Sequence, residues 1–318
     1  MIGKTGFAFV AVLLQMPAAA QDYPSAQVRI IVPAVAGGGL DIIVRPLAQR
    51  LSERWKQPVI IDNRPGAGGL IGAGAVAKAA PDGLTLLAAQ NQIMVTNRYL
   101  YKSLTYDPDT SFSPIAMMVQ ANQMILAPTS MPVHDLRELV ALIRREKGKF
   151  SYGSYGAGSQ PQLAFEMLNS REGLDIVHVP YKGIAPVITG LLGNEIQLTV
   201  GSAAVAGGLI GAGKLKALAI ASAQRDPAFP DVKTTGELGY PYLQIAVWHS
   251  LYAPAGTPSS VVNKIANDVR AVLKEPDFAK SVPGFELLDG GPQELAQRNK
   301  REVAVAQEMV ATANIRPE

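Results

Sequence analysis

The 318-residue chain contains no cysteine at all. This absence excludes disulfide bonds, and it excludes lipid attachment at a processed N-terminal cysteine. Histidine is scarce as well, because only three occur, far apart and without the i, i+4 spacing of a metal-ligand pair. A large apolar core must therefore stabilise the fold, and 48% of the residues are hydrophobic.

Charge is limited both in amount and in imbalance. Charged residues make up 17% of the chain, and the formal net charge is +3 at pH 7. The sequence has no basic stripe interleaved with aromatic side chains, which argues against a nucleic-acid partner. After the N-terminal region, no segment approaches the roughly 18 uninterrupted apolar residues that a membrane-spanning helix needs.

The N-terminal region has the pattern of an export signal. Lys4 is its only charge, Phe7–Leu14 is an apolar run, and three alanines offer a cleavage site. The sequence predicts a signal peptide over residues 1–20, cleaved near Ala20 and Gln21, and therefore a periplasmic protein. The remaining chain is near the length at which one core usually divides into two.

The chain is organised around a strand, a glycine-rich turn and a helix. Val28–Val32 is apolar and β-branched, which is typical of a buried parallel strand, and Pro33–Gly39 follows as the turn. Asp41 is expected to cap the helix, whose apolar residues recur every fourth position. Free N–H groups and the helix dipole favour an anion there, although a turn that needs glycine only for its geometry fits equally well.

Further strands alternate with helices at a spacing that indicates βαβ units and mostly parallel sheets. A long apolar segment over 115–127 predicts a strand that leaves a first sheet and enters a second, and 246–253 could return. We therefore predict an α/β fold with two lobes, each a mostly parallel sheet flanked by helices, joined by two crossover strands. Lobe 1 is predicted over 21–122 and 249–318, and lobe 2 over 123–248.

Two segments resemble nucleotide-binding motifs, but each lacks a residue or a structural context that the motif requires. Gly208–Lys214 is close to a phosphate-binding loop, but Leu215 stands where a magnesium-binding Ser or Thr is required. Gly72–Ala77 matches a loose dinucleotide fingerprint, but it lies inside a predicted helix. The sequence therefore predicts no cofactor and no metal. Polar residues at strand ends are instead predicted to hold a ligand: Gln90, Asn91, Ser154, Ser159, Tyr181 and Ser202.

Six segments together resemble a known family. They lie over residues 32–41, 63–69, 80–83, 151–154, 178–183 and 253–258. In order and spacing they are similar to the Bug family, the substrate-binding proteins of tripartite tricarboxylate transporters. The resemblance covers essentially the whole chain after the signal segment.

The resemblance implies a two-lobed Venus-flytrap fold and a binding protein rather than an enzyme. Such a receptor captures a small carboxylate in the cleft between the lobes and delivers it to the transporter's membrane subunits, as a monomer. Two loops, 34–41 and 154–159, would grip the carboxylate. The resulting candidate ligand-binding residues are Ala34, Val35, Ala36, Gly37, Gly38, Gly39, Asp41, Gln90, Asn91, Ser154, Tyr155, Gly156, Ala157, Gly158, Ser159, Tyr181, Gly201 and Ser202.

The sequence also leaves alternatives open. Ala36, Leu40 and the segment after the strand at 195–200 depart from the family pattern at positions that face the ligand in relatives, so the carboxylate is not identified. The same fold could serve a sensor that docks on a membrane signalling protein. An exported serine hydrolase built on Ser154 or Ser202 with His178 is a further reading.

Overall fold

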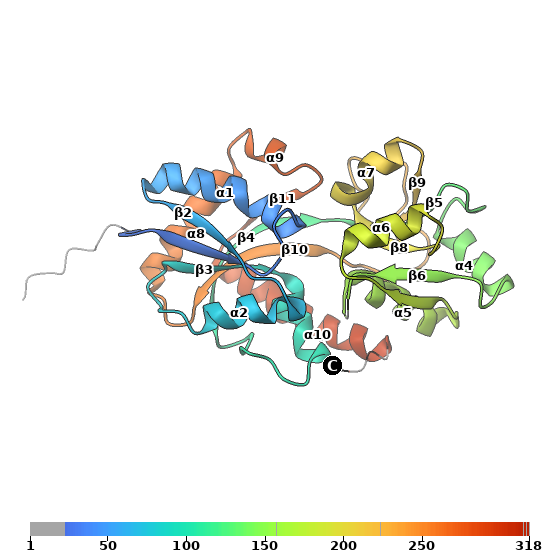
Figure 1. Cartoon of the computed structure of the whole chain (residues 1–318), viewed down its shortest axis with the longest axis horizontal. Helices are drawn as coiled ribbons and strands as arrows, with labels where there is room; N and C mark the ends of the chain where they lie inside the picture. The colour runs from blue at the N-terminus through green and yellow to red at the C-terminus, as the bar shows by residue number, and fades with distance from the viewer. Residues whose placement is uncertain (1–22, 157, 223, 314, 316, 318) are drawn as a thin grey trace, which may run out of the picture.

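The computed structural model describes residues 23–156, 158–222, 224–313, 315 and 317. The predicted signal peptide and its cleavage site lie outside the described residues. Two groups of strands, each with its own helices, lie side by side along the longest axis of the molecule (Figure 1). The α/β fold with two lobes is therefore confirmed.

A six-stranded sheet forms the first lobe, in the order β11-β4-β10-β3-β1-β2. The strand β1 pairs in parallel with β2 and β3, whereas β10 runs antiparallel to β3 and β4, and β11 runs antiparallel to β4. The expectation of a mostly parallel sheet holds only for β1, β2 and β3. Because the chain returns from the second lobe at the edge where β3 ends, β10 must run against β3. The bounds are β1 Val28–Val32, β2 Val59–Asn63, β3 Thr85–Gln90, β4 Phe112–Ala121, β10 Val247–Pro254 and β11 Glu286–Gly290.

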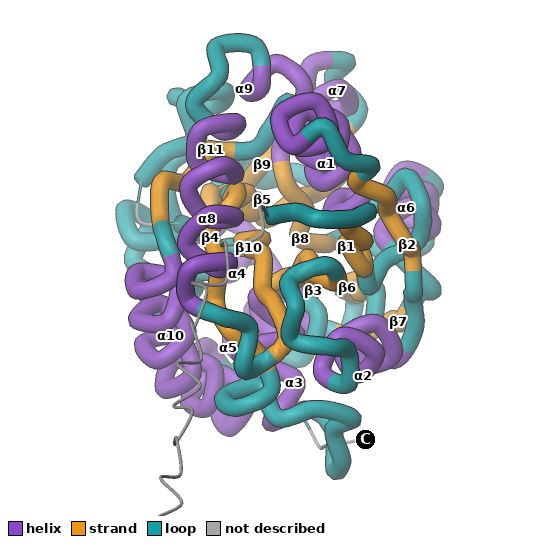
Figure 2. The backbone as a smooth tube through the Cα atoms, turned by 90° about the vertical axis from the view of Figure 1, so that its left-hand side faces the viewer, coloured by secondary structure: helices purple, strands orange, loops and turns teal. Residues whose placement is uncertain are grey.

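Helices cover both faces of this sheet (Figure 2). On one face α1 (Gly39–Trp55) and α8 (Ser259–Leu273) bury an apolar stripe against the strands. On the other face lie α2 (Leu70–Ala77), the π-helical turn η2 (Gln92–Thr96) and α10 (Pro292–Thr312). The shorter elements of this lobe are η1 (Ala67–Gly69), α3 (Asn97–Leu100) and α9 (Phe278–Ser281).

The second lobe contains a unit equivalent to the start of the first. In lobe 1, β1 lies between β2 and β3 and leads into α1. In lobe 2, β6 pairs in parallel with β7, contacts the segment before β8 through the Tyr152–Leu198 bridge, and leads into α5. The strand β5 pairs antiparallel with β8 and β9, so this lobe also mixes directions. The bounds are β5 Gln123–Pro128, β6 Ser151–Ser154, β7 Val177–Pro180, β8 Thr199–Ser202, β9 Leu215–Ile220, α4 Leu136–Arg145, α5 Gln160–Glu172, α6 Ile184–Leu192 and α7 Ala203–Gly211.

The chain passes between the lobes along β4 and β5, and returns along β10 (Figure 1). The strand predicted over 115–127 is thus two strands, separated at Asn122, and this break lets the chain change sheets. The C-terminal segment contacts both lobes, because Leu295 of α10 packs in a core of lobe 1 and Ala313 packs in the core of lobe 2. The predicted division at 122 and 249 stays a prediction.

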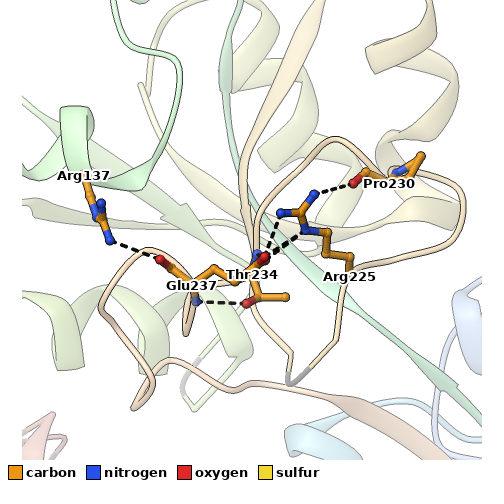
Figure 3. A network of polar contacts seen from close by, with 5 residues as sticks. All are labelled: Arg137, Arg225, Pro230, Thr234 and Glu237. Atoms are coloured by element: carbon orange, nitrogen blue, oxygen red, sulfur yellow. Dashed lines mark hydrogen bonds and ion pairs between the residues drawn. The ribbon is translucent and has the colours of Figure 1, made fainter.

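A long connection between β9 and β10 is held by one polar network (Figure 3). The Arg225 guanidinium binds the Glu237 carboxylate, with a shortest distance of 2.7 Å, and donates to the Pro230 carbonyl at 2.9 Å. The N–H of Thr234 donates to the same carboxylate, and Arg137 of α4 donates to the Glu237 carbonyl. These contacts fix the segment that leads the chain back into β10.

Several elements differ from their predicted bounds, and some were not predicted. The strand predicted over 195–200 is β8, and it lies further toward the C-terminus, so that Gly201 and Ser202 belong to it. No strand was predicted at β11, since its residues are short of apolar character and only Gly290 is buried. An edge strand of this kind carries little hydrophobic signal.

Candidate functional site

The first glycine turn lies between β1 and α1. The helix begins at Gly39 and its N-cap is Gly38, so the predicted N-cap at Asp41 is wrong. A capping residue needs an extended backbone, which Gly38 has, whereas Asp41 is already helical. The Asp41 side chain turns back instead, and its Oδ2 accepts a hydrogen bond of 2.8 Å from the Gly37 N–H.

The Asp41 carboxylate is fully buried and fully paired. Besides the bond from Gly37, it accepts bonds from Arg45 Nε at 2.7 Å, Arg45 Nη2 at 2.9 Å and Asn63 Nδ2 at 2.9 Å. Asn63 also donates to the Ala34 carbonyl at 3.1 Å. Burial raises the pKa of Asp41, but these bonds outweigh it and hold the pKa below its ordinary value. The charge therefore shapes the turn and is compensated within the protein.

This turn keeps several N–H groups available to a ligand. The Gly37 N–H is used by Asp41, and the Gly38 N–H donates to the Val35 carbonyl at 3.0 Å. Among the described residues, none accepts from the N–H groups of Val35, Ala36 or Gly39. Together with the start of α1, these groups are unpaired donors of the kind that can bind an anion. Leu40, by contrast, is buried in the core.

The end of β3 carries Gln90 and Asn91. Asn91 Nδ2 donates to the Ala246 carbonyl at 3.1 Å, which ties this end of the sheet to the segment that enters β10. The Oδ1 atom of the same side chain is buried and has no hydrogen-bond partner. Gln90 is half-buried and pairs with His249 across the β3–β10 ladder.

The second glycine turn lies between β6 and α5, at the place equivalent to the first. Ser154 is fully buried, and its Oγ lies 2.7 Å from His178 Nε2. Ser159 is the N-cap of α5, and its hydroxyl donates to the Gly156 carbonyl at 2.7 Å. Ala157 lies outside the described residues.

The flanks of this turn are held by neutral side chains. The Tyr155 hydroxyl donates to Gln160 Oε1, and the Gly158 N–H donates to Gln162 Oε1 at 2.7 Å. The Tyr181 N–H donates to the Ser154 carbonyl at 2.8 Å, which joins the turn to the end of β7. No carboxylate bonds to this turn among the described residues.

Gly201 and Ser202 end β8, directly before α7. Ser202 is the N-cap of α7, but its side chain makes no capping bond, and it is 7% exposed. The first N–H groups of α7 therefore have no partner from Ser202. This third helix start has the same anion-binding potential as the starts of α1 and α5.

The two lobes touch at two places beside these turns. A Cβ on Gly158 would lie 1.9 Å from Leu100 Cδ1, so the second turn packs directly on α3 of lobe 1. A Cβ on Gly284 would lie 2.6 Å from the Ala204 nitrogen, so the segment before β11 reaches the start of α7. No sequence pattern indicated these contacts, because each joins residues that are far apart in the chain.

A cavity of about 370 Å³ also lies between the lobes, with α10 forming one of its walls. Of the predicted site residues, only Asn91 lines it, and the remaining walls come from α5, α10 and the crossing segments. The cavity is thus lined by other elements than the glycine turns, and the predicted binding residues are not gathered around it.

The Ser154–His178 pair resembles two of the three members of a catalytic triad. In the described part of the chain, no carboxylate bonds to His178, whose ring stacks on Tyr152 with centroids 4.9 Å apart. Burial lowers the pKa of His178, although Glu166 opposes this effect. The ring therefore lacks the orienting acid that a serine nucleophile requires.

Within the residues described, no cluster of three or more His, Asp or Glu side chains could hold a metal ion. Over the same residues, no helix has the length and apolar character needed to cross a bilayer. What the site offers is a set of backbone N–H donors, hydroxyls and amides.

Comparison with known proteins gives a consistent result. Residues 43–315 match the family model described as tripartite tricarboxylate transporter family receptor. The chain is similar to three solved structures. It is 33% identical to R. palustris Rpa4515 with adipate, covering 93% of this chain and 100% of that one, with a TM-score of 0.86.

The other two structures are equally well covered. One is the periplasmic binding protein BugD, 33% identical over 93% of this chain and 100% of that one, with a TM-score of 0.82. The other is MatC from Rhodopseudomonas palustris with bound malate, 30% identical over 91% of this chain and 100% of that one, with a TM-score of 0.81.

Proposed function

Because the chain belongs to the tripartite tricarboxylate transporter receptor family, whose members are solute-binding proteins and not enzymes, we propose that it captures a small carboxylate between its lobes. It then delivers this anion to the membrane subunits of a transporter of the same type. It acts in the periplasm, after cleavage near Ala20, and as a monomer.

One observation carries this proposal. The equivalent turns after β1 and β6 each precede a helix start, and unpaired N–H groups remain at the first turn. Charge-assisted bonds from such groups to a carboxylate are short and strong. The one carboxylate at the first turn, Asp41, is neutralised by Arg45, so that it does not repel an anion.

The relatives narrow the class of ligand. Two similar structures contain adipate and malate, which each carry two carboxylates. A ligand of this kind could place one carboxylate at each glycine turn. We therefore propose a dicarboxylate as the ligand class.

A thermal-shift screen of the purified protein tests this function. The screen uses adipate, malate, succinate, citrate and benzoate, with amino alcohols as cationic controls. A ligand that binds only the folded form raises Tm, by an amount set by its concentration over Kd. A rise with a carboxylate supports the proposal, whereas a rise with the cations alone contradicts it.

Delivery and export need separate measurements. Uptake of the radiolabelled carboxylate should fall in cells that lack this gene and, equally, in cells that lack the transporter's membrane subunits. Uptake that stays normal without those subunits would point to a sensor. Mass spectrometry of periplasmic protein should find an N-terminus near Gln21.

A further inference from the structure

His249 and Gln90 form a polar pair on an otherwise apolar face of the first sheet, at the C-terminal end of β3. In β10, Leu251 and Ala253 pack into the core beneath α1 and α8. His249 is two residues before Leu251, and side chains alternate along a strand, so it lies on this same face. Gln90 pairs directly with His249, and it shares the face for the same reason.

The pair lies beside the first glycine turn. The strand β1 is the other neighbour of β3. The turn that follows β1 extends beyond the level of Gln90 along the strand direction. On the far side of His249 the row continues with Val119 of β4 and Leu287 of β11, both apolar. His249 and Gln90 are thus the polar members of the row that borders the turn.

Two helix starts meet above His249. The Phe285 ring packs edge-on against the imidazole, with centroids 6.0 Å apart, and a Cβ on Gly39 would lie 4.0 Å from the same ring. The adjacent residue, Gly284, contacts the Ala204 nitrogen. The segment over His249 therefore joins the start of α1 in lobe 1 to the start of α7 in lobe 2.

The imidazole itself has no partner for one of its nitrogens. His249 is 4% exposed, and its Nδ1 is buried without a hydrogen bond. An unpaired polar atom in such a place costs free energy, and it persists in proteins where function requires it. Among the described residues, the amide of Gln90 beside it makes no hydrogen bond to the ring, so the imidazole keeps an unused hydrogen-bonding capacity.

No charged neighbour controls this ring. On α1, Asp41 and Arg45 bind each other, and on β11 Glu286 binds Gln120. On α8, Arg270 is paired with Asp289. Burial alone lowers the pKa of His249 to about 4. At neutral pH the ring is therefore neutral and can donate one N–H.

We propose that His249 is a ligand-binding residue, whose ring donates a hydrogen bond to the carboxylate held at the first glycine turn, beside the start of α1. Gln90 lies beside it as a second donor, and Phe285 forms the apolar wall. The inference rests on the proposed function, and it names a contact that the sequence alone did not indicate.

Calorimetry on matched variants tests the contact. The probe is whichever of adipate, malate, succinate, citrate and benzoate raises Tm of the wild-type protein. His249→Phe keeps a ring against Phe285 but removes both nitrogens, and Kd should rise about tenfold or more. His249→Gln, which restores an N–H donor, should recover part of this loss.

Ser250→Ala is the matched control. Ser250 is the next residue of β10, it is fully buried, and its hydroxyl also lacks a partner, but it points to the opposite face. Its Kd should stay within about twofold of wild type. Equal losses in His249→Phe and Ser250→Ala would mean that disturbing β10 is enough, and would overturn the contact.

NMR of the wild-type protein gives a readout that needs no variant to fold. The chain has three histidines, so each Cε1 signal can be followed with pH, with and without the probe. A carboxylate bonded to His249 favours the charged ring and should raise its pKa. An unchanged His249 pKa with saturating probe overturns the inference alone, whereas a wild type that binds no carboxylate overturns the proposed function and with it this inference.

Discussion

The two glycine turns occupy equivalent places but are held by different chemistry. The turn after β1 is fixed by an ionised group, since the buried Asp41 binds Gly37, Arg45 and Asn63. The turn after β6 is fixed by neutral groups, through Ser154 with His178 and through the amides of α5.

This difference shows how one arrangement can be built with or without charge. Where a charge lies near a proposed anion site, the fold surrounds it with donors, and the anion then meets only the N–H groups of the turn. The second turn needs no such compensation, because its partners are neutral. It packs directly against Leu100 of the other lobe. The comparison can be tested by changing each turn separately.

The largest effect is expected from alanine at one glycine of positive φ in each turn. Gly37 and Gly158 both have positive φ, of 77° and 67°, which costs about 1–2 kcal/mol for any L-residue. Only Gly158 also meets a neighbour, because its Cβ would overlap Leu100. Gly158→Ala should therefore reduce the free energy of unfolding by about 3 kcal/mol, against about 1 for Gly37→Ala.

Urea denaturation of both variants measures this contrast. The double variant Leu100→Ala, Gly158→Ala should lose less stability than the sum of the two single losses, because the overlap disappears while Leu100→Ala itself leaves a cavity. Equal losses for Gly37→Ala and Gly158→Ala would show that the second turn does not press on α3.

The next effect concerns Asp41→Asn. All the partners of this carboxylate are donors, so an Asn at this position would turn its own NH₂ group toward a donor. The unfolding free energy should fall by about 2–3 kcal/mol, because bonds to a charged group are lost. This expectation differs from that for a simple cap, where Asn and Asp are nearly equal.

Ser154→Ala is the matched change in the neutral turn. Here the effect should appear in binding, with Kd of the carboxylate raised about tenfold, which corresponds to about 1.4 kcal/mol. Stability should change by less than in Asp41→Asn, since only a neutral hydrogen bond is lost. Calorimetry that finds an unchanged Kd would remove this hydroxyl from the proposed site.

The smallest effect is a difference in pH response. The pKa of His178 is lowered by burial, so the unfolded chain takes up this proton first, and stability declines as pH falls below about 6.5. The pKa of Asp41 is also lowered, so its contribution is present above about pH 4 and is lost only below it.

Denaturation curves between pH 7 and pH 3 separate the two turns. His178→Gln should reduce the decline that begins below pH 6.5, to which His249 also contributes, and Asp41→Asn should reduce only the decline at the acidic end. A change in the upper range for Asp41→Asn would contradict the assignment of a lowered pKa to that carboxylate.

Much of the fold could be predicted from local patterns. The strand at Val28–Val32 has the predicted bounds, because its apolar and β-branched run is typical of a buried strand. The edge strand β11 could not be predicted, since it buries too little to leave a pattern. The residues of the candidate site could be named from the sequence, but their contacts with one another could not be predicted. Whether they bind the ligand stays a prediction.

Local sequence patterns specify the alternation of strands and helices, the glycine turns between them and the family, because these depend on residues that are close together in the chain. The packing of the folded chain makes Asp41 turn back to bind Gly37, Arg45 and Asn63, and it places His249 beside Gln90. Both arrangements depend on pairing and packing between distant segments. A sequence pattern specifies which face a residue occupies, but only the folded chain specifies what that face meets.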